Sequence, residues 1–186
     1  MKRGLDIAVA SAGLVLLSPL LLAIAIAVRL ESPGPALHWS RRVGRRNRTF
    51  RMPKFRTMRP GAPDVATHLL ADPDRWVTRL GVFLRRSSLD ELPQLWSVLK
   101  GDMSLVGPRP ALFNQADLVA LRTQAGVDAL RPGLTGWAQI NGRDELPVTD
   151  KAKLDREYLE RMSFGFDLRI LAATAFAALS GRGVTH

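Results

Sequence analysis

Hydrophobic positions are most continuous near the start of the chain, where Ile7 to Val28 forms a run of 22 residues without a charged side chain. About 20 apolar residues suffice for a helix to cross a bilayer, so the length of the run alone predicts a transmembrane helix. Ser18 and Pro19 lie in the middle of the run. Proline removes the hydrogen bond to the Val15 carbonyl and kinks the helix, while the Ser18 hydroxyl can partly satisfy the freed oxygen.

Basic residues flank this run on both sides. Lys2 and Arg3 precede it, and Arg29 and the block from Arg41 to Arg59 follow it. Cationic flanks prefer the cytoplasmic side of a membrane, which would place both ends of the run on that side. We therefore predict a re-entrant membrane helix over residues 1–30, broken at Ser18-Pro19, and a straight span is the alternative.

Shorter patterns fill residues 31–186, which we predict to form a small cytoplasmic globular domain, mostly α with short β segments and so of the α+β class. Alternating bulky and polar residues predict strands, and helical spacing ended by Gly or Pro predicts helices. The expected strands are Ala36 to Val43 and Thr49 to Met58, and the expected helices are Trp76 to Arg86, Pro93 to Lys100, Leu112 to Gln124 and Lys151 to Met162.

A second apolar segment, Leu168 to Leu179, lies near the C-terminal end. Its 12 residues are too few to cross a bilayer. Phe164 and Phe166 precede it and Arg169 and Arg182 lie near its ends, so it fits an amphipathic helix in the membrane interface. An ordinary core helix is the alternative.

Composition narrows the possible chemistry. The chain carries a net charge of +10, and Ser40 to Pro60 contains nine basic residues and no acidic one. Such a block attracts nucleic acid or anionic lipid, and its position just after the apolar run favours lipid. The absence of cysteine excludes disulfides and thiolate metal sites, and the three histidines have no metal-ligand spacing. A Mg²⁺ site formed by carboxylates remains possible.

The segment from Arg85 to Pro110 carries the most distinctive chemistry. It places adjacent carboxylates, Asp90 and Glu91, between arginines and the rigid Pro108-Arg109-Pro110. A carboxylate can attack phosphorus or hold Mg²⁺, and guanidinium groups neutralise phosphate oxygens. The alternative is a capping box, in which Ser88 caps a helix and Glu91 reaches back. Neighbouring helical residues point about 100° apart, so the two acids are expected to have different roles.

Arg131 to Arg143 is a second candidate segment. Its cations, Arg131 and Arg143, stand beside tight turns, and Gln139 and Asn141 offer amide hydrogen bonds near the flat ring of Trp137. This mixture suits a sugar or a nucleotide, but a buried turn needs the same residues.

Taken in order, these motifs resemble the bacterial sugar transferase family, the monotopic polyprenyl-phosphate phosphoglycosyl transferases. The resemblance covers nearly the whole chain, which looks like the minimal catalytic unit of that family. The matching motifs are the basic N-terminus, the Ser18-Pro19 break, Lys54 to Met58, Ser88 to Gln94, Lys100 to Ser104, Val106 to Pro110 and Arg131 to Trp137.

The resemblance implies transfer of a phosphosugar from a UDP-sugar, N-acetylated or of the bacillosamine type, to undecaprenyl phosphate with release of UMP. Asp90 would be the nucleophile, and Glu91 would bind Mg²⁺ or act as a base, with both acids as metal candidates. Lys54, Arg85 and Arg109 would contact phosphates, and Pro108 and Pro110 would hold Arg109 rigid. Weaker candidates for contacts with the nucleotide or the sugar are Arg131, Gln139, Asn141 and Arg143.

The same resemblance places the catalytic domain, residues 31–186, on the cytoplasmic face of the bacterial inner membrane. Interfacial C-terminal helices would set its depth, and later glycosyltransferases are possible partners. The competing hypothesis is a non-catalytic, membrane-anchored basic binding protein, in which Asp90 and Glu91 only cap a helix. Nucleic acid is not an expected partner, because basic motifs with interleaved aromatic residues are absent.

Overall fold

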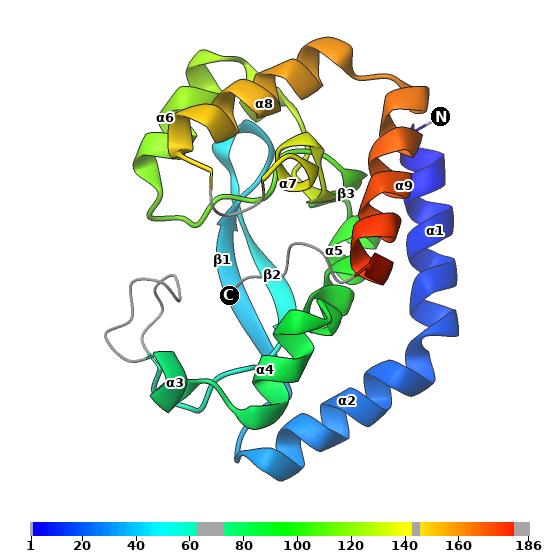
Figure 1. The fold of residues 1–186 in the computed structure, drawn as a ribbon, viewed down its shortest axis with the longest axis vertical. Coiled ribbons are helices and arrows are strands. Elements are labelled where there is room, and N and C mark those ends of the chain that lie inside the picture. The colour runs from blue at the N-terminus through cyan, green and yellow to red at the C-terminus, as the bar shows by residue number, and fades with distance from the viewer. Residues whose placement is uncertain (1, 63–72, 143–145, 181–186) are drawn as a thin grey trace.

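The computed structural model describes residues 2–62, 73–142 and 146–180. Helices dominate and the strands are short, as predicted for an α+β chain (Figure 1). The helices are α1 Lys2–Leu16, α2 Ser18–Glu31, α3 Pro73–Trp76, α4 Arg79–Arg86, α5 Leu95–Lys100, α6 Ala116–Gln124, α7 Trp137–Ile140, α8 Val148–Arg161 and α9 Phe164–Ser180. The strands are β1 Leu37–Val43, β2 Thr49–Phe55, β3 Ser104–Val106 and β4 Gly133–Thr135.

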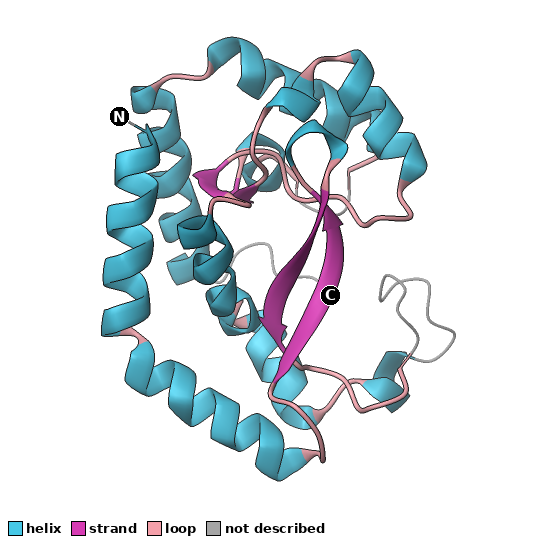
Figure 2. Ribbon diagram, turned by 180° about the vertical axis from the view of Figure 1, so that it is seen from behind, coloured by secondary structure: helices cyan, strands magenta, loops and turns pink. Residues whose placement is uncertain are grey.

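The two predicted strands form an antiparallel hairpin through the middle of the molecule (Figure 2). Its register pairs Leu37 with Phe55 and Val43 with Thr49. The Val43 N–H also donates to the Ala111 carbonyl at 2.9 Å, which brings the Pro-Arg-Pro segment to the edge of β1. Strands β3 and β4 form a separate parallel pair on either side of that segment in the sequence.

The predicted break in the apolar run is confirmed. Helices α1 and α2 meet at an angle of 61°, and the Ser18 hydroxyl donates to the Val15 carbonyl at 2.8 Å. Among the described helices, none is by itself long and apolar enough to cross a membrane, whereas this bent pair meets the length and composition test together. Large apolar side chains around the bend are exposed, including Val15 at 72% and Leu16 at 78%.

The start of α1 is fastened to the globular part of the chain. Lys2 pairs with Asp167 and donates to the Tyr158 hydroxyl, and both Tyr158 and Asp167 are buried. Arg3 donates to the last carbonyls of α5, at 2.6 and 2.8 Å. The carboxylate of buried Asp6 accepts hydrogen bonds from the Ser104 hydroxyl and the Leu105 N–H. The cations expected only to flank a membrane segment therefore hold the fold together.

The end of α2 is fastened as well. Arg56, which follows β2, donates to the Ser32 and Pro33 carbonyls at 2.6 and 2.9 Å. The Glu31 carboxylate accepts the Leu80 N–H at 3.0 Å, at the start of α4. Both ends of the bent pair are thus held by one globular body, and the exposed bend lies between them (Figures 1 and 2).

Helix α9 combines features of the two alternatives for the C-terminal apolar segment. Ile170 is fully buried in the main hydrophobic cluster with Met52 and Met103. Phe176, in contrast, is 69% exposed, and Phe164 and Leu168 are also exposed. The helix lies beside α1 in both views (Figures 1 and 2). One face belongs to the core, and another leaves apolar side chains exposed.

Candidate active site

Asp90 and Glu91 lie in η3, a short 3₁₀ helix over Leu89–Gln94 that connects α4 to α5. The alternative of a capping box is wrong: Ser88 has a left-handed backbone with φ 55°, and its side chain makes no capping hydrogen bond. Pro93 lies inside the helical stretch, where its ring prevents a regular α-helical start. Because η3 packs against β2, the local structure places Asp90 and Glu91 beside the hairpin.

Basic side chains from three segments converge on these carboxylates. Lys54 comes from β2 and Arg85 from the last turn of α4, and both act electrostatically on Asp90. The Nε of Arg85 is oriented by the Thr57 hydroxyl at 2.9 Å. Arg109 pairs with the Glu91 carboxylate at 2.8 Å. The structure therefore brings together five predicted site residues, Lys54, Arg85, Asp90, Glu91 and Arg109.

Arg42 belongs to the same cluster and was not singled out from the sequence. It acts electrostatically on Lys54 and Glu91, and it donates to the Pro110 carbonyl at 3.2 Å. Its Nε also donates to the Ser40 hydroxyl at 3.1 Å. Because side chains alternate along a strand, positions 38, 40 and 42 share a face with their partners 54, 52 and 50. That alternation, with the hairpin register, is the signal that distinguishes Arg42 from Arg41.

Pro108-Arg109-Pro110 is held by backbone contacts as well as by proline rings. The Pro108 carbonyl accepts the Gly133 N–H at 2.9 Å, and the Gly107 N–H donates to the Thr135 carbonyl at 2.9 Å. The Arg109 carbonyl accepts a hydrogen bond from Arg122. Arg122 in turn pairs with the buried carboxylate of Asp155 at 2.6 Å. The Arg122–Asp155 ion pair therefore helps to hold the Arg109 backbone in place. Its two members are far apart in the sequence.

The two carboxylates have different environments. Burial, followed by repulsion from Glu91, raises the pKa of Asp90 to about 6, although Lys54, Arg85 and Arg109 oppose the shift. Burial also opposes ionisation of Glu91, but attraction and hydrogen bonding by Arg109 prevail and its pKa is below the usual range. Within the described residues the Asp90 carboxylate accepts no hydrogen bond. Glu91 is thus an anion fixed by Arg109, whereas Asp90 is a more basic carboxylate.

The pKa values of two surrounding cations are shifted downward, which also disfavours their charged forms. Burial, together with repulsion from Arg42 and Arg85, lowers the pKa of Lys54 to about 8. Burial also lowers the pKa of Arg85, against the attraction of Asp90. Crowded, partly desolvated cations are stabilised by a bound anion. The cluster therefore suits a substrate that carries several negative charges.

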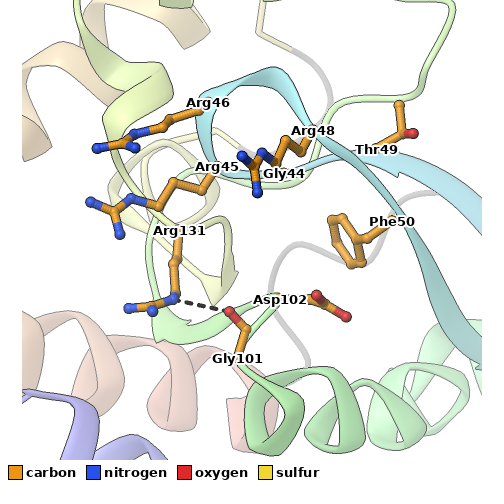
Figure 3. A pocket seen from close by; sticks show the side chains of 9 residues that line it. All are labelled: Gly44, Arg45, Arg46, Arg48, Thr49, Phe50, Gly101, Asp102 and Arg131. Atoms are coloured by element: carbon orange, nitrogen blue, oxygen red, sulfur yellow. Dashed lines mark hydrogen bonds between the residues drawn. The ribbon is translucent and has the colours of Figure 1, made fainter.

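Arg131, Gln139 and Asn141 lie elsewhere. Gln139 donates to the Leu134 carbonyl and Asn141 to the Trp137 carbonyl, so both make local hydrogen bonds around the Trp137 turn. Arg131 donates to the Gly101 carbonyl and lines a cavity of about 350 Å³ (Figure 3). Neither Asp90 nor Glu91 lines this cavity. Arg143 lies outside the described residues.

The donor set fits Mg²⁺ only with help from a substrate. Within the described residues there is no group of three or more acidic or histidine side chains that could hold a metal ion. Mg²⁺ commonly uses one or two carboxylates together with substrate phosphates and water, which Asp90 and Glu91 could satisfy. Glu91 would first have to give up one of its contacts to Arg109.

Comparison with known proteins supports the resemblance seen in the motifs. A family model described as bacterial sugar transferase matches residues 1–181. A UDP-glucose:undecaprenyl-phosphate glucose-1-phosphate transferase from Caulobacter vibrioides is 43% identical over 188 residues, covering 96% of this chain and 70% of that protein.

Two other relatives are considerably longer. A UDP-N-acetylgalactosamine-undecaprenyl-phosphate N-acetylgalactosaminephosphotransferase from Aeromonas hydrophila is 39% identical, covering 98% of this chain and 44% of that protein. A UDP-glucose:undecaprenyl-phosphate glucose-1-phosphate transferase from Escherichia coli is 40% identical, covering 95% of this chain and 39% of that protein. The chain therefore spans less than half the length of these two relatives.

Proposed function

This chain belongs to the bacterial sugar transferase family, and on that basis we propose that it transfers a sugar phosphate from a UDP-sugar to undecaprenyl phosphate and releases UMP. The observation that carries the proposal is the Asp90 centre, where a buried carboxylate with a raised pKa lies among Lys54, Arg85 and Arg109. A nucleophile and cations that neutralise phosphate are what phosphoryl transfer requires.

In the first half of the reaction, an Asp90 carboxylate oxygen attacks the phosphorus that bears the sugar. A new P–O bond forms to Asp90 as the bond to UMP breaks, so UMP leaves with the electron pair. In the second half, the phosphate oxygen of undecaprenyl phosphate attacks the same phosphorus, and Asp90 leaves as a free carboxylate. Two half-reactions allow a soluble and a lipid substrate to use one site in turn.

The cations make the attack of an anion on an anion possible. Lys54 and Arg85 act electrostatically on Asp90 from β2 and α4, and both have depressed pKa values that a bound diphosphate would relieve. Arg109 is held by its Glu91 contact and by its backbone hydrogen bond from Arg122. Preorganised charges of this kind stabilise a transition state without having to reorganise during the reaction.

Mg²⁺ would be held by Glu91, with Asp90 as the second candidate, and when bound it would offset the charge of the diphosphate. A Glu91 that binds no metal would remain the partner that orients Arg109. The alternative role of Glu91 as a base is less well supported, because its low pKa makes it a weak proton acceptor.

The sugar is a separate question. Relatives are named for UDP-glucose and for UDP-N-acetylgalactosamine at similar identity, 43% and 39%. We propose a UDP-sugar as the donor, with an N-acetylated sugar as the first class to test. Enzymes that extend the lipid-linked sugar would be the downstream partners.

We also propose a monotopic placement on the cytoplasmic face of the bacterial membrane. The exposed apolar bend of α1 and α2 would enter one leaflet, and both ends would return to the same globular body. Support comes from the anchoring of Arg3 on α5 and of Arg56 on the residues after α2. A straight span would have to break one of these two attachments.

The non-catalytic alternative treats Asp90 and Glu91 as part of a helix cap, and against it the Ser88 side chain makes no capping hydrogen bond. A direct test is UMP release by the purified chain in nanodiscs with Mg²⁺, undecaprenyl phosphate and a panel of UDP-sugars. We expect release that depends on the lipid acceptor, on the metal and on Asp90. Lack of release across a broad panel from a folded protein would favour a basic lipid-binding protein.

The placement has its own test, since the chain has no cysteine. A cysteine introduced at Gly4 would meet no heavy atom within 4 Å, so the Gly4→Cys variant should keep the fold. The re-entrant arrangement predicts no reaction with a membrane-impermeant thiol reagent added outside intact cells, and full reaction after lysis. Reaction in intact cells would establish the spanning alternative. Glu160→Cys, on the exposed face of α8, is the matched control on the globular body.

A further inference from the structure

A cavity of about 350 Å³ lies between the turn of the hairpin and the loop after α5 (Figure 3). The turn contributes Arg45, Arg46 and Arg48, and Arg131 comes from the segment before β4. Asp102 also lines the cavity, but it pairs with Lys100 at 3.1 Å. The walls therefore combine four guanidinium groups with one acid, whose Oδ2 lies near the Lys100 ammonium but makes no hydrogen bond among the described residues.

Among the described residues, two of these guanidinium groups form hydrogen bonds through Nε only. Arg45 donates from Nε to the Ala129 carbonyl at 2.7 Å, and Arg131 donates from Nε to the Gly101 carbonyl at 3.0 Å. Each hydrogen bond orients the group and leaves its two terminal nitrogens for another acceptor. Figure 3 shows the side chains of Arg45, Arg46 and Arg131 extending toward the same side. Pairs of such nitrogens match phosphate oxygens in geometry.

The turn adopts an uncommon backbone conformation. Arg46 and Asn47 both have positive φ, 55° and 57°, although neither is glycine. Consecutive left-handed residues of this type are costly, so they indicate a conformation held by its surroundings. The Asn47 side chain contributes to that, because it donates to the Thr123 hydroxyl at 2.9 Å. The three arginines of the turn are therefore held by a backbone with a specific conformation.

This cavity is separate from the Asp90 centre. Phe50, which lines the cavity, and Lys54 lie on the same face of β2, about 13 Å apart along the strand. Met52 lies between them on that face and is buried in the core with Met103. None of the clustered residues around Asp90 lines the cavity. Buried Met52 therefore separates Phe50 from Lys54 along β2, whereas Arg42 of the Asp90 cluster lies opposite Phe50 in the hairpin.

The cavity also lies at the end of α1 that is far from the exposed bend. An added Cβ at Gly101, in the cavity wall, would come within 3.4 Å of the Arg3 guanidinium, in the first turn of α1. Thirteen residues of helix separate Arg3 from Leu16, a distance of about 20 Å. The position favours a soluble ligand over a lipid headgroup.

We infer that this cavity is a second anion site, which binds the phosphate groups of a soluble ligand of the nucleoside diphosphate class. Four guanidinium groups supply the charge for two phosphates. The ring of Phe50 gives the wall a flat apolar surface against which a base can stack. A volume of about 350 Å³ is within the range of small-molecule sites. Occupancy does not require transfer at Asp90.

A local probe can test this site independently of the carboxylates. Thr49 lies on the rim of the cavity and is exposed, so Thr49→Cys can carry an environment-sensitive fluorophore in a chain without other cysteines. We expect a saturable response to UDP in the detergent-solubilised full chain, and the same response when Asp90→Ala is added. A chain with no saturable response would overturn the inference.

A pair of charge reversals tests the assignment to these arginines. Arg48→Glu should weaken UDP binding about tenfold or more, because a cation that contacts phosphate becomes an anion. Arg51→Glu makes the same charge reversal on the same hairpin. Arg51 is exposed, lies opposite Arg41 in the strand register and does not line the cavity. Its reversal should change the affinity less than twofold. Equal losses in the two variants would indicate a diffuse charge effect and would overturn the site.

Two further arms distinguish the source of the phosphate and the independence of the site. Vesicles of phosphatidylglycerol should not reproduce the response of the probe, and neither should vesicles of phosphatidylcholine. A response to phosphatidylglycerol but not to UDP would assign the cavity to lipid headgroups instead. Lys54→Met should leave the response to UDP unchanged; its loss would mean that the cavity is an extension of the Asp90 centre.

Discussion

Two buried groups of ionisable residues lie within this small chain, and they are built in opposite ways. At the start of α1, Asp6 accepts hydrogen bonds from two donors, Ser104 and Leu105, and Asp167 accepts hydrogen bonds from Lys2 and Tyr158. At the Asp90 centre, the Asp90 carboxylate accepts no hydrogen bond from the described residues, and its pKa is raised to about 6. The carboxylates of the first group are satisfied within the protein, and the Asp90 carboxylate is not.

The difference separates a structural from a chemical use of the same side chains. A buried carboxylate with donors at each oxygen stabilises the native arrangement and has no reason to react. A buried carboxylate without donors costs stability, and that cost is recovered when a substrate or a covalent bond removes the charge. The contrast predicts that mutations in the two groups will affect stability with opposite sign.

The largest effect is expected from Asp90→Asn. Loss of the nucleophile should lower UMP release by at least about a thousandfold. Because the folded-state pKa of Asp90, about 6, lies above its ordinary value of 3.8, ionised Asp90 destabilises the fold at pH 7. The amide should therefore raise the free energy of unfolding by about 1–3 kcal/mol.

Thermal unfolding at two pH values checks the sign of this effect. The gain from Asp90→Asn should be present at pH 7 and should disappear as the pH falls through 6 toward 4, where the wild-type carboxyl becomes neutral. A variant that loses both activity and stability would show that Asp90 is a structural residue, contrary to the comparison.

Asp6→Ala should have the next largest effect, and on stability. It leaves the Ser104 hydroxyl and the Leu105 N–H buried without their acceptor. We expect a loss of about 2–4 kcal/mol in the free energy of unfolding. Glu160→Ala removes an exposed carboxylate that pairs with Arg156, and should change stability by less than about 0.5 kcal/mol. Similar losses of unfolding free energy in the two variants would show that the Asp6 contacts do not anchor α1.

The two groups also differ in how far the sequence could predict them. Adjacent acids between arginines identified the Asp90 centre directly, and the alternation of residues identified both strands of the hairpin. The proline in the apolar run identified the break between α1 and α2, because its effect on a helix is local. Each of these features depends on residues that are close together in the sequence.

The anchoring of α1 could not be predicted in this way. Lys2 and Arg3 find their partners 165 and 95 positions away, so only the tertiary fold shows that these cations are more than flanking charges. The capping-box alternative at Ser88 fails for a related reason, since η3 packs against β2 and the local capping motif does not form. Arg42 required the hairpin register to be recognised.

Arg109→Lys would sharpen the comparison within the Asp90 centre itself. Lysine keeps the charge but cannot contact both Glu91 oxygens and a phosphate with one planar group. We expect kcat/KM to fall about tenfold to a hundredfold, with little change in stability. Arg51→Lys, an exposed position on the β1–β2 hairpin, is the control and should leave kcat/KM unchanged. An active Arg109→Lys variant would mean that charge alone is needed there.

The smallest effect is a dependence of kcat/KM on pH, which tests whether the two shifted groups act together. Asp90 must be ionised to attack, so kcat/KM should rise with pH up to about 6, close to tenfold per unit below that value. Lys54 must be protonated to hold a phosphate, so kcat/KM should fall above about 8. Replacing Lys54 with methionine should abolish the fall at high pH, and should raise the pKa of Asp90 because one of the charges that lowers it is gone. If kcat/KM of Lys54→Met still falls at high pH, that fall belongs to another group. Of the two shifted groups tested, only Asp90 would then act in the reaction through its unusual pKa.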